Sequence, residues 1–204
     1  MSFDSLGIFC SNTFATRKIN FSYTQLGAIL PSNCRFIITH INEAEIRSAD
    51  GYSIFEPTLK LEVQGQNVFR EMGVDGIDRV VIMHFIETAL RKTRKLVEEF
   101  PGNAKRDYPY GLLGTGVIIR LKRNNGALDV FLETESRFGP VPKTVAMNYS
   151  NIVGTISLRD WVEAIVDLSG ELIDYFRLLN PRVYEDLKNL ELHRQILGQF
   201  LQSL

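Results

Sequence analysis

The fold of this chain is decided by one amphipathic segment, residues 157–179, which reads SLRDWVEAIVDLSGELIDYFRLL. Its apolar side chains recur at steps of three and four residues, so they share one side of a helix with about 3.6 residues per turn. They are Leu158, Trp161, Val162, Ile165, Leu168, Leu172, Ile173, Phe176 and Leu179. The pattern predicts a long helix whose apolar side, including the only tryptophan of the chain, packs into the core.

Both ends of this helix are marked in the sequence. Ser157 and Asp160 form a predicted capping pair, because the hydroxyl can accept from a free first-turn N–H and the carboxylate favours the positive end of the helix dipole. At the other end Pro181 follows Asn180, and proline has no N–H with which to continue a helix. The helix is therefore expected to end before residue 181.

The composition is that of an ordinary globular protein. Of the 204 residues, 45% are hydrophobic and 23% are charged, and the formal net charge is -1. A nearly neutral chain gives no global argument for a polyanionic partner, so only local charged patches can carry such a function. We predict a single domain over residues 1–204, in which the proline-rich break at residues 136–142 is the best candidate for a hinge.

The expected compartment follows from signals that the sequence lacks. No basic region precedes a continuous apolar stretch near residue 1, and the apolar runs are far shorter than the roughly 20 residues that cross a bilayer. The two cysteines, Cys10 and Cys34, lack the spacing of a metal finger, and without a secretory signal they are expected to be reduced and buried. These features predict a cytoplasmic protein with no membrane contact.

Strand patterns precede the first long helix. Residues 17–23, 34–41 and 59–63 alternate or are rich in β-branched and aromatic side chains, which predicts strands. Residues 42–49 fit either a short helix or the end of a strand. Residues 78–100 predict a helix, because they contain neither glycine nor proline over a length that outweighs their β-branched opening.

The second half of the chain contains the clearest hairpin. Residues 115–122 and 127–133 are joined by residues 123–126, in which Asn125 and Gly126 supply the positive φ angles of a tight reversing turn. The preceding residues 105–114, KRDYPYGLLG, are rich in turn formers and are expected to be a connection. A short strand is expected at residues 152–156, directly before the organising helix.

The order of these elements predicts an α+β fold. Strands follow one another in hairpin succession and the helices are grouped, which favours a mainly antiparallel sheet with helices packed on one face. The helices are expected at about residues 78–100, 157–179 and 182–202. The last of them is too apolar for a free tail, so it is expected to dock on its own sheet, on a second copy or on another protein.

An acidic stripe runs along the polar side of the organising helix. We use this name for five carboxylates spaced three, four, four and three residues apart: Asp160, Glu163, Asp167, Glu171 and Asp174. The simplest interpretation is a solvated face opposite the core. A di-metal site is disfavoured because no Glu-x-x-His pair accompanies the stripe. The functional interpretation that we prefer is a surface for a basic protein partner.

A basic cluster in the first long helix and the segment after it suggests a different partner. Its members interleave cations with aromatic rings, the combination that contacts phosphates and stacks on bases. They are Arg91, Lys92, Arg94, Lys95, Lys105, Arg106, Tyr108 and Tyr110. Glu98 and Glu99 follow closely, however, and cations late in a helix also complement its dipole. Nucleic-acid binding is therefore the alternative hypothesis.

No catalytic motif emerges from the sequence. Nucleophile-elbow and zinc-protease motifs are absent, and His84 with Glu87 supplies too few ligands for a metal. We therefore predict no catalytic residue, metal or cofactor, although a single sequence leaves open a site assembled from distant residues. The expected function is that of a non-catalytic protein-binding or regulatory domain, which acts through its charged patches and through its C-terminal helix, by which copies of the chain can also associate.

Overall fold

The structure is a computed structural model that describes residues 33–39, 43–48, 57–101, 107–134 and 152–204. Its strands form two antiparallel sheets, and the predicted α+β class is confirmed. One sheet has the order β1 (Cys34–Thr39), β2 (Thr58–Val63), β3 (Gln66–Asn67), and the other has the order β4 (Asp107–Leu112), β5 (Val117–Asn124), β6 (Ala127–Thr134), β7 (Ile152–Ser157). The strands thus divide between two sheets where the sequence suggested one.

The helix predicted at residues 78–100 begins only at Ile82, because the β-branched Val80 and Val81 are not helical. Six helices are present in the described residues. They are α1 (Glu43–Ser48), the short 3-10 helix η2 (Val68–Met72), α2 (Ile82–Glu99), α3 (Leu158–Leu179), α4 (Pro181–Asp186) and α5 (Lys188–Ser203). The single helix predicted at 182–202 is wrong in one respect, since it is interrupted at Leu187. This leucine is fully buried, so the chain turns at that point to place α5 against α3.

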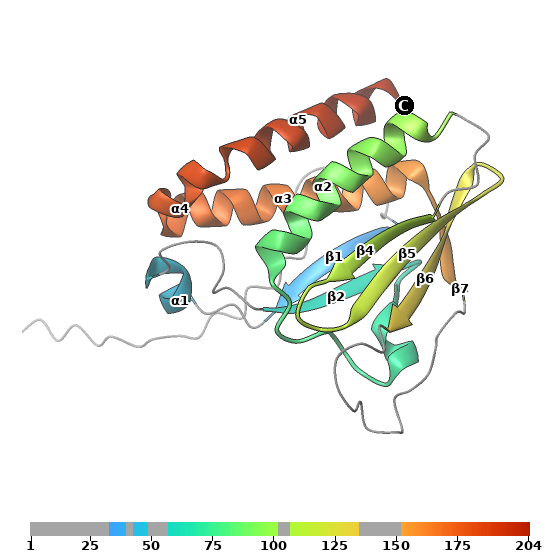
Figure 1. Cartoon of the computed structure of the whole chain (residues 1–204), viewed down its shortest axis with the longest axis horizontal. Helices are drawn as coiled ribbons and strands as arrows, with labels where there is room; N and C mark the ends of the chain where they lie inside the picture. The colour runs from blue at the N-terminus through green and yellow to red at the C-terminus, as the bar shows by residue number, and fades with distance from the viewer. Residues whose placement is uncertain (1–32, 40–42, 49–56, 102–106, 135–151) are drawn as a thin grey trace, which may run out of the picture.

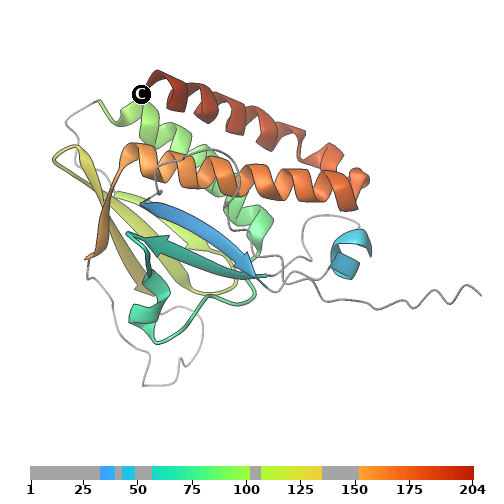
Figure 2. The same ribbon diagram turned by 180° about the vertical axis from the view of Figure 1, so that it is seen from behind.

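Figures 1 and 2 show the arrangement from opposite sides. Strands β1 and β2 lie on one side of the molecule and β4–β7 on the other. Helices α2 and α3 lie above both sheets, with α3 against β1 and α2 against β4. Helix α5 is outermost and contacts both α2 and α3, so the C-terminal segment docks within its own chain, on helices and not on a sheet. No helix in the described ranges has the length and apolar character needed to cross a membrane.

The core is centred on Trp161, which is fully buried as predicted. Its ring packs edge-on against Phe36 of β1 and Tyr110 of β4, with centroids 5.6 and 4.9 Å apart. Its Nε1 donates to Thr93 Oγ1 of α2 at 3.1 Å, and the same hydroxyl lies 3.3 Å from the Tyr110 hydroxyl oxygen. One tryptophan therefore joins both sheets and both long helices.

The predicted hairpin is confirmed. Strands β5 and β6 pair up to Asn124 and Ala127, and the two residues between them are Asn125 with φ 47° and Gly126 with φ 87°. Two successive positive φ angles are those of a tight turn that matches the twist of the strands. Strand pairing continues through Arg123 and Asn124, so the loop is two residues shorter than the connection expected at residues 123–126.

The connection expected at residues 105–114 is wrong, because most of it is strand β4. Tyr108, Tyr110 and Leu112 alternate inward, and this period outweighs the turn-forming residues between them. Pro109 is tolerated because β4 is an edge strand, where an N–H is not needed for pairing. Lys92 of α2 donates to the Pro109 carbonyl oxygen and so covers this free edge.

Several sequence predictions fall partly or wholly outside the described residues. These are the strand at residues 17–23, the hinge at 136–142, and the side chains of Cys10, Lys105 and Arg106. The open choice at residues 42–49 is resolved as helix over Glu43–Ser48.

Candidate protein-binding surfaces

The first residue of the acidic stripe has a structural role. Ser157 and Asp160 form the predicted capping box, in which the Asp160 N–H donates to Ser157 Oγ and the Ser157 N–H donates to the Asp160 carboxylate, each at 3.0 Å. This pairing satisfies two backbone donors at the start of α3. Asp160 is thus occupied within the chain.

The last residue of the stripe is also paired. The Asp174 carboxylate accepts from Arg177 at 2.8 Å, one turn along α3. Arg177 in addition donates to Glu191 of α5 at 3.0 Å and to the Tyr184 hydroxyl of α4 at 2.8 Å. This network fixes the C-terminal end of α3 to α4 and α5, the two helices that follow it.

The three middle carboxylates differ from both ends. We call Glu163, Asp167 and Glu171 the acidic ridge; none of them has an ion pair or side-chain hydrogen bond with any other part of the chain that the structure describes. They lie four residues apart, so like charges neighbour one another along the helix. Their charge is therefore not compensated at close range by the described residues.

Partial burial raises the proton affinity of this ridge. Loss of water around the carboxyl group, with a smaller contribution from the charge of Asp167, raises the pKa of Glu171 from 4.5 to about 7. Asp167 is exposed as a residue, yet partial desolvation of its carboxyl group and the charge of Glu163 raise its pKa too. Both shifts mark negative charge that the protein does not stabilise.

Arg194 of α5, whose charge acts on Asp167, is used for another contact. Its Nε donates to the backbone oxygen of Val166 at 3.1 Å, and its guanidinium lies across Gly170. A Cβ on Gly170 would come within 2.4 Å of Arg194 Nη2, which explains the glycine in the middle of a helix. The charge of Arg194 offsets part of the upward shift in the Asp167 pKa, but Arg194 forms no ion pair with this carboxylate. Sequence reasoning missed this contact, although Ser169 and Gly170 in mid-helix are a signal of a close approach.

The stripe continues into an exposed leucine. Leu178 follows Asp174 by four residues, so it extends the same line along α3, and 76% of its surface is exposed. It directly follows Arg177, which the network with Glu191 and Tyr184 holds in place. The polar side of α3 thus presents both uncompensated charge and an apolar contact.

The basic cluster of α2, by contrast, is largely paired within the chain. Arg94 contacts Glu98 at 2.9 Å and Lys95 approaches Glu99 to 3.9 Å, in each case one helical turn away. Lys92 bonds to the β4 backbone, and partial burial followed by the charge of Arg91 lowers its pKa. Three of the four cations on α2 therefore have partners within the chain, and Arg91 has none among the described residues.

The aromatic members of the cluster are not available for stacking on bases. Tyr108 is buried and its hydroxyl donates to Glu99 at 2.9 Å, while Tyr110 is fully buried beside Trp161. On the neighbouring strand, Arg120 donates to both Glu133 oxygens at 2.6 and 2.7 Å. The side chains that alternate in sequence therefore face the core or carboxylates of their own chain.

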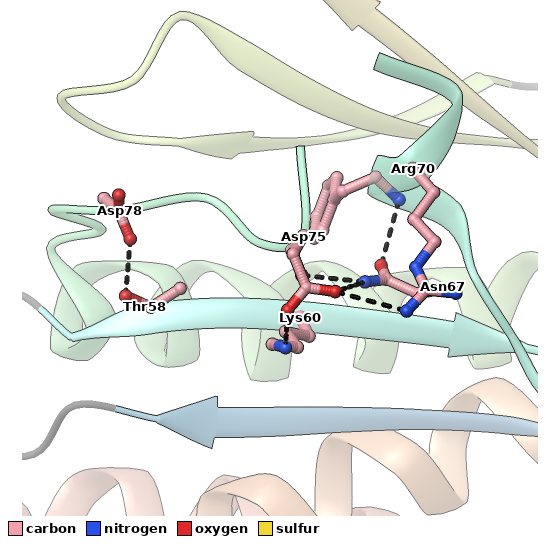
Figure 3. A network of polar contacts seen from close by, with 7 residues as sticks. Thr58, Lys60, Asn67, Arg70, Asp75 and Asp78 are labelled. Atoms are coloured by element: carbon pink, nitrogen blue, oxygen red, sulfur yellow. Dashed lines mark hydrogen bonds and ion pairs between the residues drawn. The ribbon is translucent and has the colours of Figure 1, made fainter. Parts of the chain in front are cut away.

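A polar network on the β2 side was not foreseen from the sequence, because its members are distant from one another (Figure 3). Asp75 accepts from Lys60 of β2 and lies 3.5 Å from Arg70, while Asn67 Nδ2 donates to the Asp75 backbone oxygen at 2.7 Å. The hydrogen bond from Lys60 is the main cause of a lowered Asp75 pKa. Asp75 is thus held by two cations and one amide, and the network closes the loop before α2.

The described residues contain no cluster of three or more His, Cys, Asp or Glu side chains arranged to hold a metal ion. His84 and Glu87 are both exposed on α2. Cys34 is buried, and burial raises the pKa of its thiol, so it is not poised as a nucleophile.

The chain matches no known protein-family model, no curated protein and no solved structure. Its surfaces must therefore be judged from their own chemistry. Among the charged groups that the sequence singled out, the three carboxylates of the acidic ridge and Arg91 have no ion pair or side-chain hydrogen bond with the described residues, and only the ridge brings several such like charges together.

Proposed function

We propose that this protein acts by binding another protein, and that the acidic ridge of α3 together with Leu178 is the contact surface for a basic partner. The observation that supports this proposal is that Glu163, Asp167 and Glu171 have no ion pair or side-chain hydrogen bond with the described residues. Such a role is non-catalytic and requires no cofactor, in agreement with the expectation from sequence.

The energetic argument rests on partial desolvation. Carboxylates that lose water without gaining a cation reduce the stability of the free chain. Lysine or arginine side chains of a partner would supply the missing charge, and an apolar side chain could cover Leu178, which is 76% exposed. Surfaces that lower stability in the free protein and are relieved on binding are typical of functional sites.

The geometry also limits the partner. The proposed contact surface, from Glu163 of the acidic ridge to Leu178, extends over about 22 Å at 1.5 Å per helical residue. The complementary segment therefore needs basic residues at spacings near 6 Å and an apolar residue at one end, as one face of a basic amphipathic helix provides. A nucleic acid as partner is supported less well, because Lys92, Arg94 and Lys95 of α2 have carboxylate or backbone partners.

The binding experiment uses a labelled helical peptide of about 15 residues that carries lysine and leucine, and a second peptide with glutamate in place of lysine. In the ridge variant, Glu163→Gln, Asp167→Asn and Glu171→Gln are combined. We expect fluorescence anisotropy to show binding of the lysine peptide only, and the ridge variant to weaken it by about tenfold or more.

A control variant separates local contact from general attraction. Glu71→Gln, Glu87→Gln and Glu98→Gln remove the same three charges from residues that are exposed elsewhere on the molecule. This control should change affinity by less than about twofold, since screened charges at a distance contribute little. Equal losses in both variants, or tighter binding of single-stranded RNA than of the peptide, would refute the proposed surface.

A further inference from the structure

Helix α5 is fixed to the rest of the molecule through one face only. Leu190 and Leu197 are buried against the helical layer, Glu191 pairs with Arg177 of α3 at 3.0 Å, and Arg194 bonds to Val166. As the outermost helix it presents its opposite face away from the sheets (Figures 1 and 2). That outer face is held in a defined orientation.

The outer face is a ridge with an unusual composition. We call it the glutamine ridge, and its exposed members are Lys188, Leu192, Gln195, Gln199 and Gln202. Their spacings of four, three, four and three residues are those of the contact line in a two-helix coiled coil. No ionisable side chain occurs in residues 195–204, and Leu192 is 57% exposed. From residue 195 onward the glutamine ridge is uncharged, in contrast to the acidic ridge of α3.

Gly198 borders this ridge and is not explained by packing within the chain. A Cβ added to Gly198 would meet no described atom within 4 Å, whereas the same atom on Gly170 would collide with Arg194. Glycine is unfavourable inside a helix, and no contact within the described chain requires it at position 198. This suggests that an atom of another molecule approaches the helix closely there. A second helix packed on this face would benefit from the missing side chain.

We propose that the glutamine ridge is a contact between two copies of this chain, related by a two-fold axis with their α5 helices antiparallel. A two-fold contact places one surface against the same surface, which a charged ridge opposes through like-charge repulsion and a neutral ridge does not. Glutamine amides both donate and accept, so identical ridges can hydrogen-bond to each other. This inference concerns α5 and does not depend on the function proposed for α3.

The antiparallel orientation follows from the helix dipoles. Parallel α5 helices would place like ends of their dipoles side by side, whereas antiparallel helices place opposite ends together. In this arrangement Gln195 lies opposite the partner's Gln199, and Leu192 lies opposite the partner's Gln202.

The size of the contact predicts a weak dimer. From Lys188 to Gln202 the ridge is about 21 Å long, and one helix pair buries less than the roughly 1,200 Å² of a standard stable interface. A dissociation constant on the order of 10–100 μM is expected, so monomer should dominate below that range.

The test is sedimentation equilibrium of the full chain from about 5 to 500 μM, a range that brackets the expected dissociation constant. One variant combines Gln195→Glu with Gln199→Glu, and a second combines Gln195→Lys with Gln199→Lys. Each alone should remain monomeric, since like charges then face each other, whereas an equimolar mixture should restore the dimer. Gly198→Leu should also weaken association, and Gln66→Glu, on exposed β3, should leave it unchanged.

Circular dichroism of each variant confirms that the exposed substitutions leave the fold intact. A wild-type chain that stays monomeric at about 500 μM refutes the inference, given the expected affinity. So does a pair of charged variants that each dimerise as well as the wild type, or a mixture that shows no more dimer than its components.

Discussion

Helices α2 and α3 have similar amphipathic patterns but differ in whether their charged side chains have partners within the helix. Both are long and amphipathic, and their inner faces meet where Trp161 donates to Thr93. On α2 a cation is followed four residues later by a carboxylate, as in Arg94 with Glu98. On α3 a carboxylate is followed four residues later by another, as in Asp167 with Glu171. The first pattern is neutralised within one turn and the second is not.

This difference shows which charged stripes can bind a partner, namely those whose charges are not paired within the chain. A run of like residue types in the sequence says how much charge is present, not how much is compensated. Compensation depends on the spacing to opposite charges and on neighbours from other elements, such as the β4 backbone that holds Lys92. A charged helix is a good candidate for binding only where these internal partners are missing.

The largest expected effect lies where the two helices are joined. Thr93→Val leaves the Trp161 N–H without its acceptor and removes a contact of the buried Tyr110 hydroxyl, so we expect a loss of about 2–3 kcal/mol in the free energy of unfolding. Urea unfolding followed by circular dichroism measures it. Thr88→Val, on the half-buried side of the same helix, is the matched control and should cost less than about 0.5 kcal/mol. A loss below about 1 kcal/mol for Thr93→Val would show that the network does not hold the helices together.

The next effect has the opposite sign. Glu171→Gln should increase stability at pH 8 by up to about 1 kcal/mol, a figure reduced for screening because the carboxyl group is only about half buried. Thermal unfolding of the two proteins at pH 8 measures the gain. A less stable Glu171→Gln variant at that pH would mean that the charge is in fact compensated.

The pH dependence of this gain follows from the pKa shift. Because the pKa of Glu171 is about 7 in the folded state and 4.5 in the absence of the fold, the folded chain binds more protons between these values. Its stability therefore falls as the pH rises from about 4.5 to about 7, and the full loss is present above that range. The difference between wild type and Glu171→Gln should vanish below about pH 4.5. Glu87→Gln, exposed on α2, is the control.

The smallest expected effect concerns the ion pair between Arg94 and Glu98 on α2. Glu98→Gln removes the partner of Arg94 and should cost about 0.3–0.5 kcal/mol, as for other exposed pairs one helical turn apart. A double-mutant cycle with Arg94→Gln isolates the pair, and about 1 M salt should reduce its contribution. If neutralising Glu98 stabilised the protein as Glu171→Gln does, the contrast between the two helices would fail.

Local signals allowed part of this structure to be predicted. The capping box, the apolar period of α3 and the Asn125–Gly126 turn all depend on residues within a few positions of one another. Strand β4 was missed because its glycine and proline resemble a turn until the neighbouring strand and helix are known. For the candidate site, the sequence identified all three carboxylates of the acidic ridge, but it could not separate them from Asp160 and Asp174, whose partners use their charge.

Short stretches of sequence were enough to predict the long helices, the hairpin turn and the positions of charge, because each of these properties depends on residues close together in the chain. Other features depend on contacts between distant segments: Arg194 bonds to the Val166 backbone, Tyr108 and Tyr110 turn inward, and partial burial raises the pKa of Glu171 in the acidic ridge. The physical reason is that burial and ion pairing are properties of neighbours in space. Those neighbours come from parts of the chain whose distance along the sequence says nothing about their contact.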